Sequence, residues 1–239
     1  LLTVLSQPDA RDWHALPYEP RDYRASLEGG VRGLRIAYSR DLGYAKVDPE
    51  VAELVRQAVA VFRDLGAKVE ERHPGFDSPE AIFRTHWFAG AAFLVDSLKE
   101  KRDIDPGLLE VAAEGKRITA HELTDAQMKR GALGMHMNLF HRDYDLLVTP
   151  TLAVPAFDVG REFPPGNRRW TDWTPFSYPF NLTGQPAASS PCGFTKAGLP
   201  VGLHLVGPRF ADALVLRAAR AFETARPIRL PDPARLAGN

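Results

Sequence analysis

The 239-residue sequence has no excess of charge of either sign, no long apolar run and no pair of cysteines. Thirty Lys and Arg balance thirty Asp and Glu, so nucleic acid is not expected as a partner. No apolar run approaches the roughly 18 residues of a membrane-spanning helix, so no membrane association is expected. The lone Cys192 cannot form an internal disulfide, which fits a reducing cytoplasm, and we expect a cytoplasmic location.

Hydrophobic residues make up 44% of the chain and charged residues 25%, which predicts one large packed domain or two small ones. The opening Leu1–Leu5 has no Ser, Thr, Asp or Asn before it to cap a helix. We expect it to be the last turn of a helix that starts outside this sequence; a processed or trimmed terminus is the alternative. Residues 6–32 are polar with several prolines, so 1–32 is predicted to be a connecting segment.

A strand, a helix and a second strand are predicted after this segment. Residues 33–39 alternate apolar side chains as a strand does. Asp48 and Pro49 have the residue types of a helix N-cap and first position, and Gly66 favours a stop. Residues 68–72 form a weaker strand candidate. This spacing indicates a βαβ unit with a parallel strand pair.

The rest of the chain continues the alternation of helices and strands. Helices are predicted at 78–102, 106–117, 121–142 and 211–224, a buried strand at 145–149, and a hairpin at 187–192 and 200–206. Residues 151–175 show no period, and 227–239 is predicted to be a loose tail. The mixture of parallel and antiparallel patterns predicts an α/β fold for residues 33–226, with a mixed β-sheet flanked by helices.

The sequence offers little chemistry of its own. The glycines of residues 28–33 precede a strand, on the wrong side for a dinucleotide site. His136 and His141 are five apart, which does not place both on one helical face, so no metal site is expected. Cys192 is more typical of a small buried residue than of a nucleophile. Since a Gly-x-Ser-x-Gly motif is also absent, the residues by themselves predict an incomplete soluble α/β domain.

Two sequence blocks near the C-terminus carry a family resemblance. Residues 175–193 (PFSYPFNLTGQPAASSPCG) and 199–208 (LPVGLHLVGP) resemble the C-terminal hallmark of the amidase signature family. Residues 144–151 (YDLLVTPT) match its strand and Thr-Pro-Thr loop, and 33–39 with the helix from Asp48 match its βαβ insert. The resemblance covers nearly the whole chain in the right order, and it implies the C-terminal part of the amidase signature fold.

The resemblance implies catalysis by a serine nucleophile, a bridging serine and a neutral lysine, without a metal or cofactor. In the family these residues lie in a signature region upstream of the position of Leu1. We therefore expect no catalytic residue in this chain, and we expect the chain alone to hydrolyse nothing. The substrate implied is a small-molecule amide, cleaved to a carboxylate and ammonia or an amine.

What this chain contributes, by the same resemblance, is part of the substrate pocket. The loop of Thr149, Pro150 and Thr151 is implied to lie near the acyl group. The same holds for Phe176, Tyr178 and Asn181, although a core position is the alternative for Phe176.

Arg130 matches an arginine with which A subunits of glutamyl-tRNA amidotransferases hold a glutamine carboxylate, and a structural role is its alternative. The companion aspartate of those subunits aligns roughly with Thr174 and is missing here, which favours a general amidase. The alternatives to an amidase are a truncated, non-enzymatic binding module and such an A subunit. An uncovered sheet edge is expected in any of these cases, and it predicts a homo-oligomer.

Overall fold

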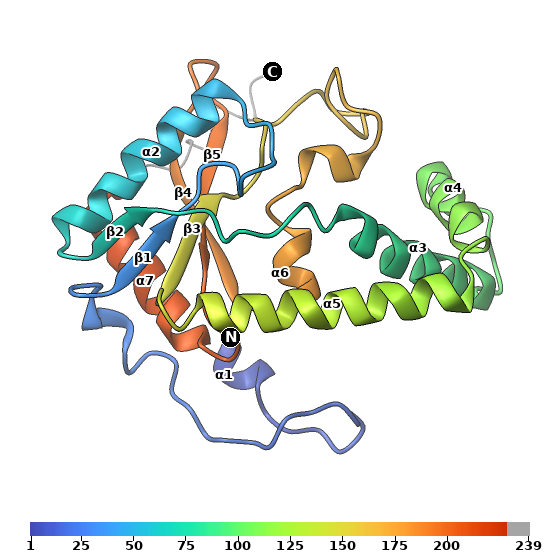
Figure 1. Cartoon of the computed structure of the whole chain (residues 1–239), viewed down its shortest axis with the longest axis horizontal. Coiled ribbons are helices and arrows are strands. Elements are labelled where there is room, and N and C mark those ends of the chain that lie inside the picture. Colours follow the sequence, from blue (N-terminus) through green and yellow to red (C-terminus); the bar gives the residue numbers. More distant parts are fainter. Residues whose placement is uncertain (229–239) are drawn as a thin grey trace.

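The structure, a computed structural model, describes residues 1–228 and contains a five-stranded sheet in the order β2-β1-β3-β5-β4 (Figure 1). The strands are β1 (Arg35–Tyr38), β2 (Lys68–Glu71), β3 (Leu146–Pro150), β4 (Ala187–Phe194) and β5 (Pro200–Val206). The helices are α1 (Leu2–Leu5), α2 (Pro49–Asp64), α3 (Glu80–Ser97), α4 (Pro106–Gly115), α5 (Ala120–Phe140), α6 (Tyr178–Thr183) and α7 (Asp212–Ala225).

The sheet combines parallel and antiparallel pairs. β1 runs parallel to both β2 and β3, whereas β5 runs antiparallel to β3 and to β4. The predicted βαβ unit is present, because α2 connects the parallel neighbours β1 and β2. β4 and β5 form the predicted hairpin, with an irregularity between Pro191 and Gly193. The predicted mixed sheet is therefore confirmed.

The ends of α2 follow from local chemistry. A carboxylate oxygen of Asp48 accepts hydrogen bonds from the backbone N–H groups of Glu50 (2.8 Å) and Val51 (3.3 Å), which no earlier turn could satisfy. Gly66 follows the helix with φ +87°, a left-handed conformation that glycine adopts without steric cost. Both expected signals of this helix are confirmed.

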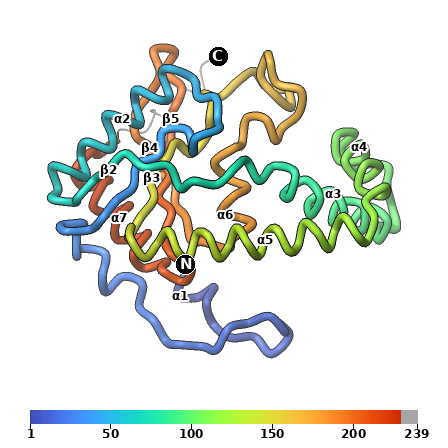
Figure 2. Tube along the Cα trace, viewed as in Figure 1, coloured from blue at the N-terminus to red at the C-terminus, as the bar shows by residue number. Residues whose placement is uncertain are grey.

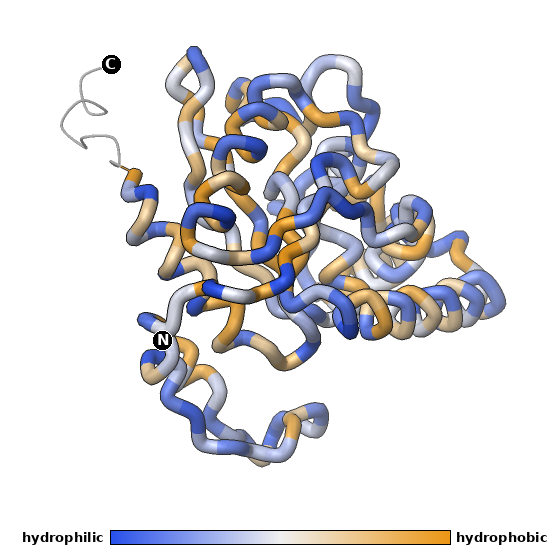
Figure 3. The backbone as a smooth tube through the Cα atoms, turned by 60° about the vertical axis from the view of Figure 1, so that its left-hand side comes forward, coloured by the Kyte–Doolittle hydropathy of each residue, from blue (hydrophilic) through white to orange (hydrophobic). Residues whose placement is uncertain are grey.

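Helices cover both faces of the sheet. α2 and α7 pack on one face, where the rings of Phe62 and Phe222 stack with centroids 5.6 Å apart. On the other face, Met137 of α5 and Phe180 of α6 pack with Phe176 in a second apolar cluster. Figure 3 shows hydrophilic and hydrophobic stretches alternating along the helices, as expected when one side of each helix faces a core.

α5 extends from the sheet to α3 and α4 at its far end (Figure 1). Its first turn is fixed by a capping box, in which Thr119 and Glu122 each accept from the other's backbone N–H. α3 and α4 approach closely, because a Cβ at Gly115 would collide with the carbonyl oxygen of Phe88. Residues 1–32 run along the outside of the body, as Figure 2 shows.

Several details differ from the prediction or lie beyond it. The helix predicted at 78–102 is α3, which ends at Ser97. The short helix α6 and a 3₁₀ turn at Trp170–Trp173 were not predicted. The predicted tail at 227–239 lies outside the described residues except for its first two positions, and the domain boundaries stay predictions.

Candidate functional site

One side of β4 is open to solvent. Its residues alternate, so that Ala187, Ser189 and Pro191 are exposed whereas Ser190 and Cys192 are buried. Within residues 1–228, β5 is the one strand paired with β4, which leaves the outer edge of β4 unpaired. This edge and the exposed face beside it are accessible to solvent.

Two hydroxyl groups meet on this open face. The hydroxyl oxygens of Thr151 and Ser189 are 2.7 Å apart, within hydrogen-bonding distance. Gly202 of β5 lies directly beneath them, because a Cβ there would sit 2.6 Å from the Ser189 oxygen and 2.7 Å from the Thr151 oxygen. The pair therefore depends on the absence of a side chain at position 202.

Thr151 and Ser189 also border an apolar hollow of about 350 Å³. Its remaining lining is mostly aliphatic: Val51, Leu152, Val154, Ala156, Pro191, Pro200, Val201 and Gly202. A hollow with apolar walls and a few hydroxyl groups fits an apolar group that ends in a polar one.

The other residues of the predicted Thr-Pro-Thr loop lie deeper. Thr149 is fully buried, and its hydroxyl donates to the carbonyl oxygen of Pro150 at 2.8 Å. His204 lies opposite Thr149 in the antiparallel register, with its Nδ1 at 3.4 Å from the hydroxyl. Burial lowers the pKa of His204 to about 4, so its ring is neutral at neutral pH.

Sequence reasoning did not single out His204. The available signal was a polar residue at the centre of an apolar strand, between Leu203 and Leu205.

The predicted residues of the 176–181 segment separate by exposure. Phe176 is fully buried in the cluster that joins α5, α6 and the sheet. Tyr178 is also buried, with its hydroxyl 3.3 Å from that of Ser78. Asn181 alone of the three is exposed. Phe176 and Tyr178 thus belong to the core in this chain, and Asn181 lies on the surface.

Arg130 lies beside α6 rather than beside Thr151. Its Nε donates to the carbonyl oxygen of Leu182 at 2.6 Å, which is a structural contact. It also borders a hollow of about 560 Å³ that Asn138 and Arg209 share. The structure therefore brings Arg130 close to the segment of Asn181, and Thr151 lines a different hollow.

Other nucleophile and metal arrangements find no support in the described residues. Cys192 is fully buried, and burial raises its pKa to about 11, so it is a thiol at neutral pH. His73 approaches Ser39 (2.9 Å) and Asp41 (3.4 Å), but both contacts use its Nδ1, whereas a catalytic triad uses both ring nitrogens. No group of three metal-ligating side chains occurs within residues 1–228.

In the same described part of the chain, no helix combines the length and the hydrophobicity needed to cross a membrane.

A sequence model of the amidase family, described as "Amidase", matches residues 1–216. This chain belongs to the amidase signature family. It is 36% identical to an acylamidase of Rhodococcus erythropolis over 238 residues, covering 95% of this chain and 50% of that protein. It is 32% identical to the A subunit of glutamyl-tRNA(Gln) amidotransferase from Myxococcus xanthus, covering 93% of this chain and 51% of that protein. This amidase signature chain thus spans about half the length of these relatives.

The fold comparison agrees with the amidase family assignment. A bacterial aryl acylamidase of the amidase signature family superposes with a TM-score of 0.77 at 28% identity, covering 92% of this chain and 49% of that one. The resemblance inferred from residues 144–151, 175–193 and 199–208 is therefore confirmed at the level of family and α/β fold. The roles of the individual pocket residues stay predictions.

Proposed function

We propose that this chain is the C-terminal part of an amidase that hydrolyses an acyl amide to a carboxylate and ammonia or an amine. The observation that carries the proposal is the 36% identity to an acylamidase along 95% of the chain. The open hydroxyl pair of Thr151 and Ser189 beside an apolar hollow supports it, because an acyl amide combines an apolar chain with a polar group.

The Ser-Ser-Lys chemistry is proposed to come from a polypeptide segment outside this sequence. A lysine that accepts a proton must be neutral, a state that burial favours. All seven lysines here are exposed: Lys46, Lys68, Lys99, Lys101, Lys116, Lys129 and Lys196. No hydrogen bond joins any of them to a serine side chain within residues 1–228. None of these lysines is therefore suited to serve as the base.

In this proposal the chain supplies one wall of the substrate pocket. Thr151 faces the substrate at the apolar hollow, with Thr149 and Pro150 fixing the backbone beside it. Asn181 contributes from the surface beside Leu182, and buried Phe176 and Tyr178 hold the 176–181 segment in place. Arg130 contributes through the hollow that it shares with Arg209. No metal or cofactor takes part, and the substrate is a small molecule.

The test measures amide hydrolysis by the purified chain and by the full-length protein made from the gene with its upstream reading frame. We expect activity on aryl or alkyl acyl amides from the full-length protein and none from this chain. In the full-length protein, Thr151→Val should lower kcat/KM at least about tenfold if the hydroxyl contacts the reacting group. The control Thr124→Val changes an exposed threonine of α5 and should leave activity unchanged. Hydrolysis by this chain alone would contradict the proposal.

An A subunit of a glutamyl-tRNA amidotransferase is the second candidate, supported by the 32% identity to such a protein. The acylamidase is favoured because its identity is higher and because Thr174 stands where an aspartate is expected. The Thr174 hydroxyl donates to the carbonyl oxygen of Trp170 at 3.3 Å, a local structural contact. Ammonia release from glutamine by the full-length protein, without turnover of acyl amides, would favour the second candidate.

We further propose that the protein is cytoplasmic and forms homo-oligomers, with no nucleic acid or membrane as partner. The lone buried Cys192 supports the cytoplasmic location, and the balanced charge supports the absence of a nucleic-acid partner. The unpaired outer edge of β4 supports the formation of homo-oligomers.

A further inference from the structure

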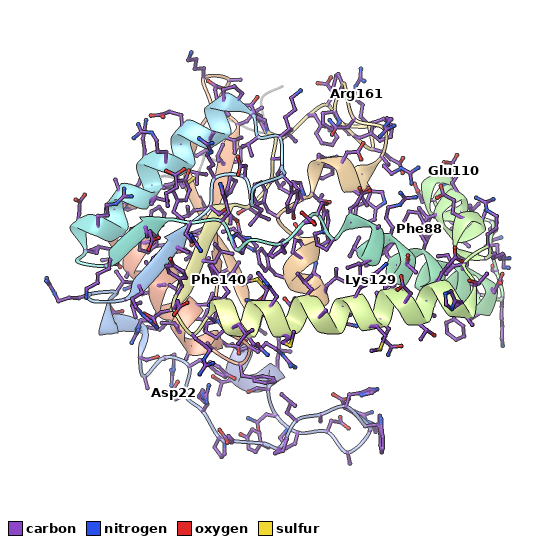
Figure 4. All side chains as sticks on the ribbon, in the orientation of Figure 1. Asp22, Phe88, Glu110, Lys129, Phe140 and Arg161 are labelled. Atoms are coloured by element: carbon purple, nitrogen blue, oxygen red, sulfur yellow. The ribbon has the colours of Figure 1, made fainter. Side chains whose placement is uncertain are left out.

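A third hollow lies away from β4, between α3, α4 and the 151–175 segment. It has a volume of about 230 Å³ and is lined by Trp87, Gly107, Leu108, Val111, Glu162 and Trp170. In Figure 4, Arg161 and Glu110 mark the two segments that border it, since they are the sequence neighbours of Glu162 and Val111. The lining thus combines two tryptophans with one carboxylate.

The two indole rings form a corner. Their centroids are 5.8 Å apart and their planes meet at 64°. Trp87 stacks on Phe83 with one face (5.6 Å, 22°), while 53% of its surface is exposed, so its other face is available. Phe83 in turn stacks on buried Tyr178 (5.4 Å, 28°), which anchors the corner to the core. Stacking thus connects the corner to the core.

Glu162 supplies the negative charge of the hollow. Within residues 1–228 no basic side chain lies within ion-pair distance of it. Its carboxylate lies against Gly107, where any Cβ would collide with it, so a glycine leaves room for the carboxylate at this position. The neighbouring Glu114, by contrast, pairs with both Arg84 (3.4 Å) and Arg169 (3.6 Å). Glu162 thus remains free to bind a cation.

We propose that this hollow binds the ammonium group of an organic cation, such as a trimethylammonium or alkylammonium group. The ring faces of Trp87 and Trp170 attract a cation through their quadrupoles, and tryptophan is the best aromatic residue for this contact. Leu108 and Val111 contact the apolar substituents, and Glu162 balances the charge. A metal ion fits poorly because the described lining provides a single carboxylate. The hollow shares no lining residue with the hollow at Thr151, and the proposal does not rest on the proposed amidase function.

The test uses the whole chain and choline as the probe, with neutral 3,3-dimethylbutan-1-ol as its isostere. The four tryptophans give four indole N–H resonances in a ¹⁵N-labelled sample, assigned by single Trp→Phe variants. Choline should shift the Trp87 and Trp170 resonances saturably and leave that of Trp13 in place, since Trp13 lies on the exposed N-terminal segment. The neutral isostere should bind more weakly.

Three variants separate the contributions. Trp87→Leu should weaken choline binding at least about threefold. Glu162→Gln should weaken it about fivefold, the upper end for an exposed charge pair. Trp13→Leu is the matched control and should bind as the original chain does. Equal binding of choline and its isostere, or choline shifts that survive Trp87→Leu, would overturn the proposal.

Discussion

The guanidinium group of Arg35 and the carboxylate of Asp145 join the starts of β1 and β3. Arg35 Nη2 donates to one carboxylate oxygen at 2.9 Å, and the Arg35 backbone N–H donates to the other at 2.7 Å. The backbone N–H of Asp145 donates in return to the Arg35 carbonyl oxygen at 2.8 Å. These bonds fix the register of two strands that are distant in sequence.

Removal of this carboxylate should destabilise the fold. Asp145→Ala removes the acceptor of the Arg35 backbone N–H and of its guanidinium group, which should cost about 1 kcal/mol in the free energy of unfolding. Urea denaturation followed by circular dichroism measures this change. Glu53→Ala is the control, because the Glu53–Arg56 pair is similarly short but lies exposed within one helix, and it should cost less than Asp145→Ala. Equal costs for the two variants would contradict the role assigned to Asp145.

The buried ring of His204 should make stability depend on pH. Burial lowers its pKa from 6.5 to about 4, so below pH 6.5 the unfolded chain binds a proton that the folded chain does not. The stabilisation by the neutral His204 ring is therefore fully present above pH 6.5. As pH falls from 6.5 towards 4, the free energy of unfolding decreases by about 3 kcal/mol on account of this residue. The free energy of unfolding measured between pH 7 and 4 checks this.

Two variants test whether His204 causes this dependence of the free energy of unfolding on pH. His204→Gln should reduce the loss of stability between pH 6.5 and 4, and His14→Gln, at an exposed position, should not. Part of the slope should remain in His204→Gln, because burial also lowers the pKa of His141. An unchanged slope would mean that His204 is not the main source.

Gly202 is predicted to tolerate no side chain. Gly202→Ala should displace the hydroxyl pair of Thr151 and Ser189 and destabilise the chain by about 1–3 kcal/mol. Adding Ser189→Gly should recover part of that loss, since it removes one of the two colliding atoms. Gly131→Ala, on the exposed side of α5 with open space around it, should instead stabilise by up to about 1 kcal/mol. Thermal denaturation of the four proteins tests the contact.

The open edge of β4 should drive self-association. We expect light scattering to show a mass that rises with protein concentration, since an unpaired strand edge pairs readily with another copy. Ala187→Lys puts a charge on the exposed side of β4 and should shift the protein towards monomer. Ala60→Lys makes the same change on the exposed side of α2 and should not. A monomer at all concentrations would rule out this association.

Local signals in the sequence predicted the local structure well. The N-cap Asp48 and the stop at Gly66 located α2, because a helix end is determined by a few neighbouring residues. α6 was not predicted, because it has six residues and its aromatic side chains show no helical period. The place of β3 between β1 and β5 also stayed open, since it depends on contacts between distant residues.

The candidate site, like the fold, could be predicted only in part from the sequence. The loop of Thr149 to Thr151 was identified from its resemblance to a family motif, which carries positional information. The contact of Thr151 with Ser189 and the burial of His204 were not foreseen, because both depend on the register of three strands. The full burial of Phe176 likewise required α5 and α6 to be placed.

The stacking of Phe62 on Phe222 has a consequence for biosynthesis. The two rings belong to helices that are distant in sequence, so one layer of the core cannot form before α7 is present. While the ribosome is still adding residues, the apolar side of α2 lacks this cover. The nascent chain should therefore be most dependent on chaperones, and most vulnerable to aggregation, until the last helix has emerged.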